Sequence, residues 1–274
     1  MEQKPARTRA AWPVPLALAL LAVGALFLIL REGEEPEPAK DASSSSPAAV
    51  VEEKVDLRSL PASSTKTTIK AAPQDPRPNK IPKGTVVHPK RMVALYDAPD
   101  GKAFAKVAPR QYGDTWLPVI TRNRDWVQVL LPSKPNGSTG WIRSGELQEA
   151  HSRFLVKVHL GARTLQLFED NREVGTWPVA IGAPDTPTPT GRTFVLGQIT
   201  DKQQPFSPVI LPLGSHSDTL DSYGGGPGTV ALHGWTDPGV FGQAVSHGCV
   251  RVPDEALDLL RTIPTGTPVL VDKT

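Results

Sequence analysis

ALHG at residues 231–234 and SHGCVR at residues 246–251 hold the groups on which the rest of this chain depends. The only cysteine of the 274 residues, Cys249, lies in the second stretch, and His233 lies in the first. A thiol is a good nucleophile only as the thiolate. It therefore needs a base within hydrogen-bond reach and backbone N–H groups that face the developing oxyanion. The two stretches together predict nucleophilic chemistry at Cys249.

Two other interpretations of Cys249 stay open at this point. A lone cysteine is often a small buried hydrophobe. Against this, Gly248 allows positive φ or a close approach of the backbone to a ligand, and an unpaired thiol in an exported protein is a candidate reactive group. Metal binding is the weaker alternative, because one cysteine forms no Cys-x-x-Cys pair and the histidines lack helical i, i+4 spacing. We expect no metal and no cofactor.

SHGCVR, preceded by His233 and Gly234, resembles the signature of the L,D-transpeptidases of the YkuD family, cysteine enzymes that remodel bacterial peptidoglycan. A second stretch agrees, since Ile181-Gly182 followed by TPTPTG at residues 186–191 is similar to that family's loop ahead of the site. The resemblance covers roughly residues 153–271, a little under half of the chain.

The resemblance implies a role for each residue of the motif. Cys249 is expected to attack the carbonyl of the third residue of a stem tetrapeptide and to expel the terminal D-alanine, which leaves a thioester. His233 is implied as the general base, with the carbonyl of Gly234 fixing its tautomer. His247 lies closer to Cys249 in sequence, but some relatives carry lysine there. For His247 a supporting role in substrate binding is therefore expected.

The other motif residues are predicted to shape the site. The N–H groups of Gly248 and Cys249 are candidates for the oxyanion hole, because a glycine turn can point successive donors at one place. Ser246 is expected to support the loop by hydrogen bonding beside the substrate. Arg251 either binds the terminal carboxylate of the substrate as a bidentate fork or forms a structural ion pair. Part of the family has asparagine at this position, which leaves the acceptor open.

Three functions follow from these residues. The leading one is a transpeptidase that makes L,D cross-links or attaches a protein to the wall. In an L,D-carboxypeptidase, water would resolve the same thioester. A non-enzymatic wall-binding scaffold is the third, and the intact pair of Cys249 and His233 disfavours it. Family members are acylated by carbapenems, so we expect the same at Cys249.

Residues 10–30 are almost uncharged, and about twenty apolar residues suffice for a helix to cross a bilayer. No small-x-small site follows Leu30, so an uncleaved anchor is favoured over a signal peptide. Basic residues precede the run and glutamates follow it, which predicts a cytoplasmic N-terminus. The expected location is the cytoplasmic membrane, crossed once, with the catalytic part in the periplasm or cell wall.

Residues 31–84 are rich in Pro, Ser, Ala, Lys and Glu, a composition that predicts a disordered linker. Residues 85–148 contain short strand patterns separated by turns, which predicts a small barrel. WVQV at 126–129 and GWI at 140–142 resemble bacterial SH3-like domains, which are thought to bind wall glycan or peptide. The tryptophans of this region form either a ligand groove or the core.

Residues 151–273 are predicted to be mostly β, like a β-sandwich, with loops from 204 to 228 and one short helix from 253 to 263. The predicted fold is therefore mainly β, an SH3-like barrel followed by a YkuD-type catalytic domain. The predicted segments are a cytoplasmic N-terminus at 1–9, an anchor at 10–30, a linker at 31–84, an SH3-like domain at 85–148 and the catalytic domain at 151–273. The net charge of +2 gives no reason to expect nucleic-acid binding.

Overall fold

The computed structural model describes residues 55–200, 205–223 and 226–274. The predicted cytoplasmic N-terminus, the predicted anchor at 10–30 and the first part of the predicted linker lie outside these residues. Within the described ranges, no helix has the length and apolar character needed to cross a membrane.

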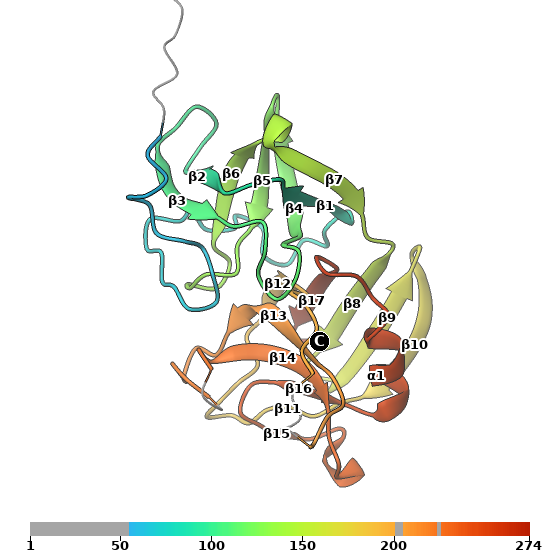
Figure 1. Cartoon of the computed structure of the whole chain (residues 1–274). Coiled ribbons are helices and arrows are strands. Elements are labelled where there is room, and N and C mark those ends of the chain that lie inside the picture. The colour runs from blue at the N-terminus through green and yellow to red at the C-terminus, as the bar shows by residue number, and fades with distance from the viewer. Residues whose placement is uncertain (1–54, 201–204, 224–225) are drawn as a thin grey trace, which may run out of the picture. The chain divides into compact units, whose positions relative to one another are not determined.

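Seven strands form an antiparallel sheet in the first half of the described chain, in the order β3-β2-β6-β5-β4-β1-β7 (Figure 1). Their bounds are β1 (Thr85–Pro89), β2 (Val93–Tyr96), β3 (Ala103–Val107), β4 (Leu117–Asn123), β5 (Trp126–Leu130), β6 (Thr139–Arg143) and β7 (Leu147–His151), with the 3-10 turn η1 (Ser144–Glu146) before β7. Alternating apolar residues such as Leu95, Val129 and Ile142 are fully buried and form the core. The mainly β prediction is confirmed here, and the SH3-like identity of this sheet stays a prediction.

Residues 55–84 pack on this sheet, so the prediction of a disordered linker is wrong for this segment. Ile69 and Ala72 belong to the hydrophobic core of the sheet. The backbone also pairs with a distant loop, since Ile69 N–H donates to the carbonyl of Lys134 (2.8 Å) and Asp75 N–H to that of Gly137 (2.8 Å). These long-range contacts offset the ordering entropy. Amino-acid composition alone does not predict these long-range contacts.

The second half has two larger sheets with one hydrophobic cluster between them. A five-stranded sheet has the order β10-β9-β8-β17-β12, a three-stranded sheet the order β13-β14-β16, and β11 pairs with β15. The cluster joins Val156 and Leu167 of the first sheet, Leu211 and Leu232 of the second, and Leu257 of the helix α1. The bounds are β8 (Phe154–His159), β9 (Thr164–Glu169), β10 (Arg172–Pro178), β11 (Ile181–Gly182), β12 (Gly191–Phe194), β13 (Ile210–His216), β14 (Thr229–Gly234), η2 (Pro238–Val240), β15 (Ala244–Ser246), β16 (Val250–Val252), α1 (Asp254–Leu260) and β17 (Pro268–Asp272).

The helix α1 lies within the segment 253–263, where the sequence predicted one short helix, and Pro253, expected in the first turn, is the N-cap residue that precedes it. Strand β13 was not predicted, because its run of proline and glycine is typical of loops. Pro212 lies where the register between β13 and β14 shifts, a position that tolerates proline. Gly214 is required by packing, since a Cβ there would lie 2.5 Å from the ring of Phe194. Within this strand, Pro212 therefore lies at an irregularity of the pairing, and Gly214 allows the close approach of the Phe194 ring.

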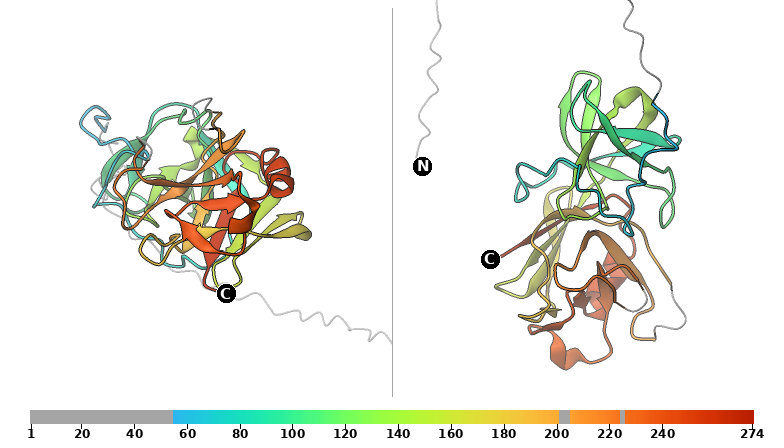
Figure 2. Two further views of the ribbon diagram at one scale, coloured as in Figure 1. Left: turned by 90° about the horizontal axis from the view of Figure 1, so that it is seen from below. Right: turned by 90° about the vertical axis from the view of Figure 1, so that its left-hand side faces the viewer.

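The two halves adjoin in the right-hand view of Figure 2, and the segment 191–196 of the second half contributes side chains to the core of the first. Phe194 is fully buried in the core cluster of the seven-stranded sheet. Arg192 forms a buried bidentate ion pair with Asp75 (2.5 and 2.7 Å). Trp116 also packs across, because a Cβ on Gly266 would lie 2.7 Å from its own Cβ. The two halves thus share a packed boundary.

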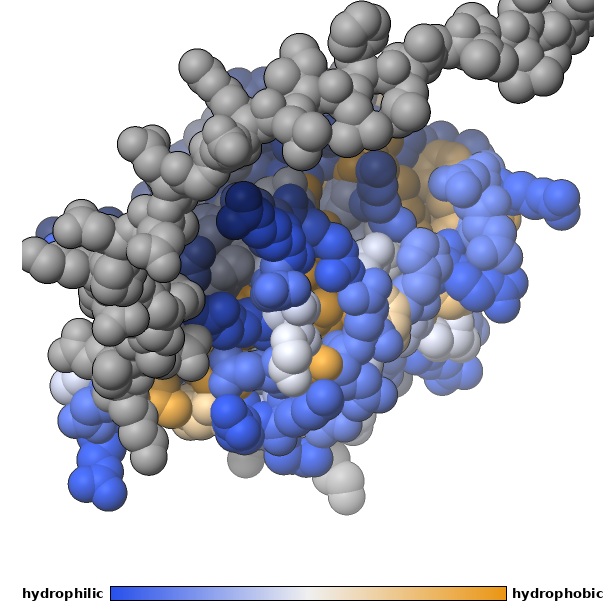
Figure 3. Space-filling view, turned by 90° about the horizontal axis from the view of Figure 1, so that it is seen from above, coloured by the Kyte–Doolittle hydropathy of each residue, from blue (hydrophilic) through white to orange (hydrophobic). Residues whose placement is uncertain are grey.

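Trp126, one of the tryptophans considered for a ligand groove, is instead a core residue, 3% exposed, with the guanidinium of Arg143 4.5 Å from its ring centre. Figure 3 shows the molecule from above the view of Figure 1. The surface that the grey atoms do not cover is largely hydrophilic, with smaller hydrophobic areas between. This is the character of a solvated face.

Candidate active site

Cys249 follows a tight turn between β15 and β16, and Gly248 in that turn has φ +112°, a conformation that side chains other than glycine rarely adopt. Ser246 ties the turn together: its Oγ donates to the carbonyl of Cys249 (2.5 Å) and accepts from the N–H of Gly248 (3.1 Å). Ser246 therefore supports the loop, as expected. The Gly248 N–H, however, is occupied by this bond. Of the two N–H groups predicted for the oxyanion hole, that of Cys249 remains the candidate.

The threonines of the TPTPTG stretch hold the same turn from the other side. Thr186 Oγ1 donates to the carbonyl of Ser246 (2.9 Å), and Thr188 Oγ1 donates to that of Gly248 (2.9 Å). Thr188 Oγ1 also accepts from the N–H of Gly182 (2.9 Å). A Cβ on Gly182 would lie 2.2 Å from the carbonyl oxygen of Thr186, so this position needs glycine. The second motif thus positions the nucleophile turn.

His233 lies on β14, which runs parallel to β16 and places His233 opposite Arg251. The His233 Nδ1 is 2.7 Å from the carbonyl oxygen of Gly234. A carbonyl only accepts, so Nδ1 carries the hydrogen and the lone pair is on Nε2. Gly234 is itself fixed, because its N–H donates to Ser207 Oγ (2.8 Å). The contact expected between His233 and Gly234 is present, and it leaves Nε2 free to act as a base.

Burial sets the protonation states of the two central groups. Burial, opposed by the hydrogen bond to Gly234 and assisted by the positive charge of Arg251, lowers the pKa of His233 to about 4. Burial raises the pKa of the Cys249 thiol, partly opposed by a backbone hydrogen bond from Ala231 and by Arg251. At neutral pH the structure therefore holds a neutral imidazole and a protonated thiol. The thiolate has to form by proton transfer during the reaction.

Arg251 is 8% exposed and stacks its guanidinium 3.5 Å from the ring centre of Trp235. Its Nε is buried with no hydrogen-bond partner. Burial lowers its pKa, opposed by Tyr223 and Cys249. Among the described residues no carboxylate lies within ion-pair distance of it. The structural ion pair considered for Arg251 is therefore not observed, and a charged donor is left for an anionic ligand.

Most of the predicted site residues line one cavity of about 590 Å³. Cys249, His233, Arg251, Ser246 and His247 all line it, whereas Gly234 and Gly248 act through their backbones. His247 is exposed and stacks on Tyr223, with ring centres 5.0 Å apart.

Sequence reasoning missed several aromatic residues of the cavity. Phe206, Trp235 and Tyr223 line it, and so does Tyr112 from the first half of the chain. Phe206 meets His233 edge to face, with ring centres 5.0 Å apart. Trp235 directly follows the first motif, so its position next to the site was a usable signal. No such signal marked the others. Within the described ranges, no group of three or more His, Cys, Asp or Glu side chains is placed to hold a metal ion.

Comparison with known proteins gives the family. Residues 153–271 match the YkuD family model, which describes the L,D-transpeptidase catalytic domain. The chain is 32% identical over 169 residues to the protein YkuD of Bacillus subtilis, covering 59% of this chain and 95% of that protein. It is 29% identical over 167 residues to the YkuD of Bacillus licheniformis, covering 58% and 94%. Among solved structures, L,D-transpeptidase 3 from Mycobacterium tuberculosis is similar with a TM-score of 0.38 and 14% identity, over 68% of this chain and 82% of that one. The sequence matches show that the chain belongs to the YkuD family of peptidoglycan L,D-transpeptidases.

Proposed function

We propose that this enzyme transfers a stem-peptide acyl group to an amine through a thioester at Cys249. One observation carries the proposal: His233 and Cys249 line one cavity, and the hydrogen bond to Gly234 leaves the lone pair of His233 on Nε2. A neutral base with a fixed tautomer is what proton transfer from a thiol requires.

In the first step, Nε2 of His233 takes the proton of Cys249 while the sulfur attacks the carbonyl carbon of the third residue of a tetrapeptide stem. The oxyanion of the tetrahedral intermediate accepts a hydrogen bond from the Cys249 N–H. When the intermediate collapses, the bond to the terminal D-alanine breaks and the imidazolium returns its proton to the leaving amine. The product is a thioester on Cys249 and free D-alanine.

In the second step, an acceptor amine attacks the thioester carbonyl, and His233 removes a proton from the amine. The carbon–sulfur bond then breaks, and the imidazolium returns this proton to the leaving thiolate, which restores the thiol. Arg251 fits the carboxylate of the stem peptide, because its charge has no carboxylate partner among the described residues and it lies in the same cavity. His247 and Tyr223 form a stacked pair at the edge of the cavity, where a substrate chain would pass.

The location of the enzyme belongs to the same proposal. Residues 10–30 would anchor it in the cytoplasmic membrane, with the catalytic half on the outer side, where peptidoglycan is found. The seven-stranded sheet would add binding to wall glycan or peptide, a proposal supported by the resemblance of residues 126–129 and 140–142 to SH3-like domains.

The test incubates the full-length chain in detergent with disaccharide-tetrapeptide, beside Cys249→Ala, and identifies the products by mass spectrometry. A cross-linked dimer with D-alanine release, absent from the variant, is expected. Tripeptide as the sole product would make the enzyme a carboxypeptidase. No turnover by either protein would favour the wall-binding scaffold. A carbapenem adduct that persists in Cys249→Ala would contradict the assignment of the nucleophile.

A further inference from the structure

Tyr112 belongs to the loop between β3 and β4, far from the catalytic motifs in sequence, and yet it lines the cavity of Cys249. The loop is closed at its base by a backbone bridge and an ion pair between Arg110 and Asp114 (2.8 Å). Its tip reaches the second half of the chain, and the Tyr112 side chain remains 40% exposed there. An exposed aromatic ring at the edge of a reaction cavity is available to a ligand.

Three contacts fix the tip of the loop that carries this ring. The backbone of Tyr112 lies directly over Gly197, where a Cβ would be 2.5 Å from the Tyr112 carbonyl oxygen. Its hydroxyl is 3.3 Å from Thr65 Oγ1, in the segment that packs on the seven-stranded sheet. Gln111 beside it donates from Nε2 to the carbonyl of Ser63 (3.0 Å). Tyr112 itself has φ +52°, which is uncommon for a bulky residue and is found where the surroundings impose it.

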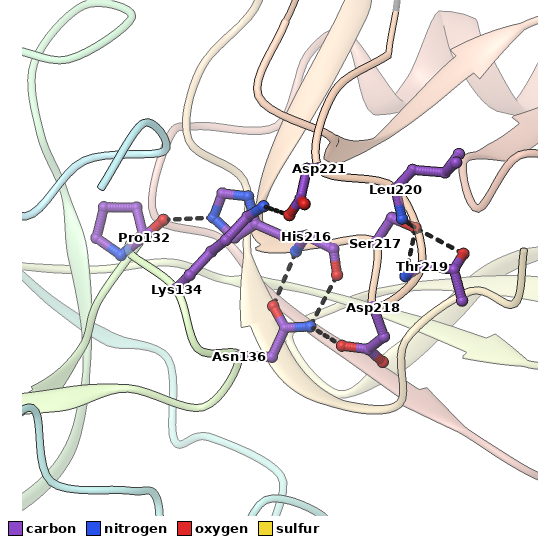
Figure 4. Close-up of polar contacts among 9 residues, drawn as sticks. All are labelled: Pro132, Lys134, Asn136, His216, Ser217, Asp218, Thr219, Leu220 and Asp221. Carbon is purple, nitrogen blue, oxygen red and sulfur yellow. Dashed lines mark hydrogen bonds and ion pairs between the residues drawn. The ribbon is translucent and has the colours of Figure 1, made fainter. Parts of the chain in front are cut away.

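Hydrogen bonds also fix the boundary between the two halves at the end of β13 (Figure 4). Asn136 Oδ1 accepts from the N–H of His216 (2.8 Å), and Asn136 Nδ2 donates to the carbonyl of His216 (2.7 Å) and to Asp218 Oδ1 (3.0 Å). His216 in turn bonds through Nε2 to the carbonyl of Pro132 (2.8 Å). His216 ends β13, the strand that pairs with the His233 strand. The position of Tyr112 relative to the catalytic residues is therefore held by side-chain and backbone bonds on both sides.

The lining of the cavity indicates what the ring would contact. Among the described lining residues, Arg251 is the one Lys or Arg, and none is Asp or Glu. Ile199, Ile210 and Pro212 line the same cavity as Tyr112 and give it apolar surface, and Ile199 pairs with Ile210 through a backbone bridge. Such a wall suits the apolar faces of a peptide whose carboxylate is bound elsewhere in the cavity.

We propose that Tyr112 is a specificity-determining residue that contacts the stem peptide, so that the first half of the chain forms one wall of the substrate site. The inference rests on the proposed function for the identity of the ligand. This role is distinct from the proposed binding of wall glycan or peptide by the seven-stranded sheet, because Tyr112 would contact the substrate inside the reaction cavity.

The test compares Tyr112→Ala with Tyr112→Phe in the full-length chain. In a Cys249→Ala background, where no turnover occurs, the dissociation constant for disaccharide-tetrapeptide is measured by calorimetry. Loss of the ring is expected to weaken binding about tenfold, and loss of the hydroxyl alone by less than about twofold. With Cys249 present, the rate of alkylation by iodoacetamide is expected to be equal in Tyr112→Ala and the parent, because a small reagent does not need the wall.

Each other outcome decides a different point. Equal binding by Tyr112→Ala and its parent would overturn the inference and leave the proposed function intact. Slower alkylation of Tyr112→Ala would show a distorted site, and would also overturn direct contact. A tenfold loss of binding without D-alanine release by the Cys249 enzyme would refute the proposed function alone. No binding by the parent would overturn both.

Discussion

The two sides of the reaction cavity are held in different ways. On the nucleophile side, Ser246, Thr186 and Thr188 bind the turn around Gly248 through short hydrogen bonds within two motifs. On the Tyr112 side, the wall depends on contacts between segments of the chain that are far apart, among them the pair of Asp75 and Arg192, separated by 117 positions. The nucleophile is therefore positioned by hydrogen bonds within the two motifs, whereas the shape of the substrate site depends on the packing of the two halves.

This difference makes the two sides separable by experiment. Substitutions at the packed boundary should lower the free energy of unfolding and the affinity for substrate, with a smaller effect on the reactivity of the Cys249 thiol. Damage to the nucleophile turn should alter the reactivity of Cys249 with a smaller effect on stability.

The largest effect is expected for Asp75→Asn. The side chains of Asp75 and Arg192 are 1% and 2% exposed, so the variant leaves a buried guanidinium without its counter-charge. Breaking a buried pair from one side costs about 3–5 kcal/mol. The measurement is the free energy of unfolding in urea.

The matched control is Glu149→Gln, which removes an ion pair between Arg122 and Glu149 whose side chains are 43% and 56% exposed. Exposed pairs contribute about 0–1 kcal/mol. If the two variants lost equal stability, the buried pair would not hold the boundary as we describe.

Acid titration tests the nucleophile side. The pKa of His233 is about 4 in the folded enzyme and 6.5 in the unfolded chain, so the unfolded state binds more protons between these values. Stability should therefore fall as the pH drops from about 6.5 to about 4, by about 3 kcal/mol from this residue alone. The same unfolding measurement on His233→Gln isolates the effect. An equal acid dependence in both proteins would show that His233 is not buried in its neutral form.

A smaller effect is expected for Thr188→Val, which keeps the shape of the side chain and removes its hydroxyl. The N–H of Gly182 and the carbonyl of Gly248 then lose a partner, at a cost of about 1–3 kcal/mol. The alkylation rate of Cys249 should change as well, because the nucleophile turn loses a support. Thr190→Val, at an exposed position in the same loop, serves as the control. If Thr188→Val behaved like the control, the hydroxyl would have no role in the turn.

The sequence was most informative where the partners of a residue lie within a motif. The contact of His233 with Gly234 and the support of the turn by Ser246 were both predicted and are both present. The motif did not show that the Gly248 N–H, one of the two predicted oxyanion-hole donors, is bonded to Ser246. The short helix α1 was also predicted, from its first-turn proline and its apolar spacing.

Features that depend on distant partners were not predictable. Residues 55–84 have the composition of a linker, and their order comes from contacts such as that of Ile69 with Lys134. Strand β13 has the composition of a loop, and its glycine is explained only by the ring of Phe194. The place of Tyr112 in the cavity depends on Gly197, 85 positions later, so no local pattern could indicate it.

The thioester at Cys249 is the central claim, and intact-protein mass spectrometry tests it most directly. After brief incubation of the full-length chain with disaccharide-tetrapeptide, the protein should gain the mass of the substrate less D-alanine, and peptide mapping should place the adduct on Cys249. The adduct should be absent from Cys249→Ala and should form about 100-fold or more slowly in His233→Gln. An adduct that persists in Cys249→Ala, or one that forms at an unchanged rate in His233→Gln, would contradict the account.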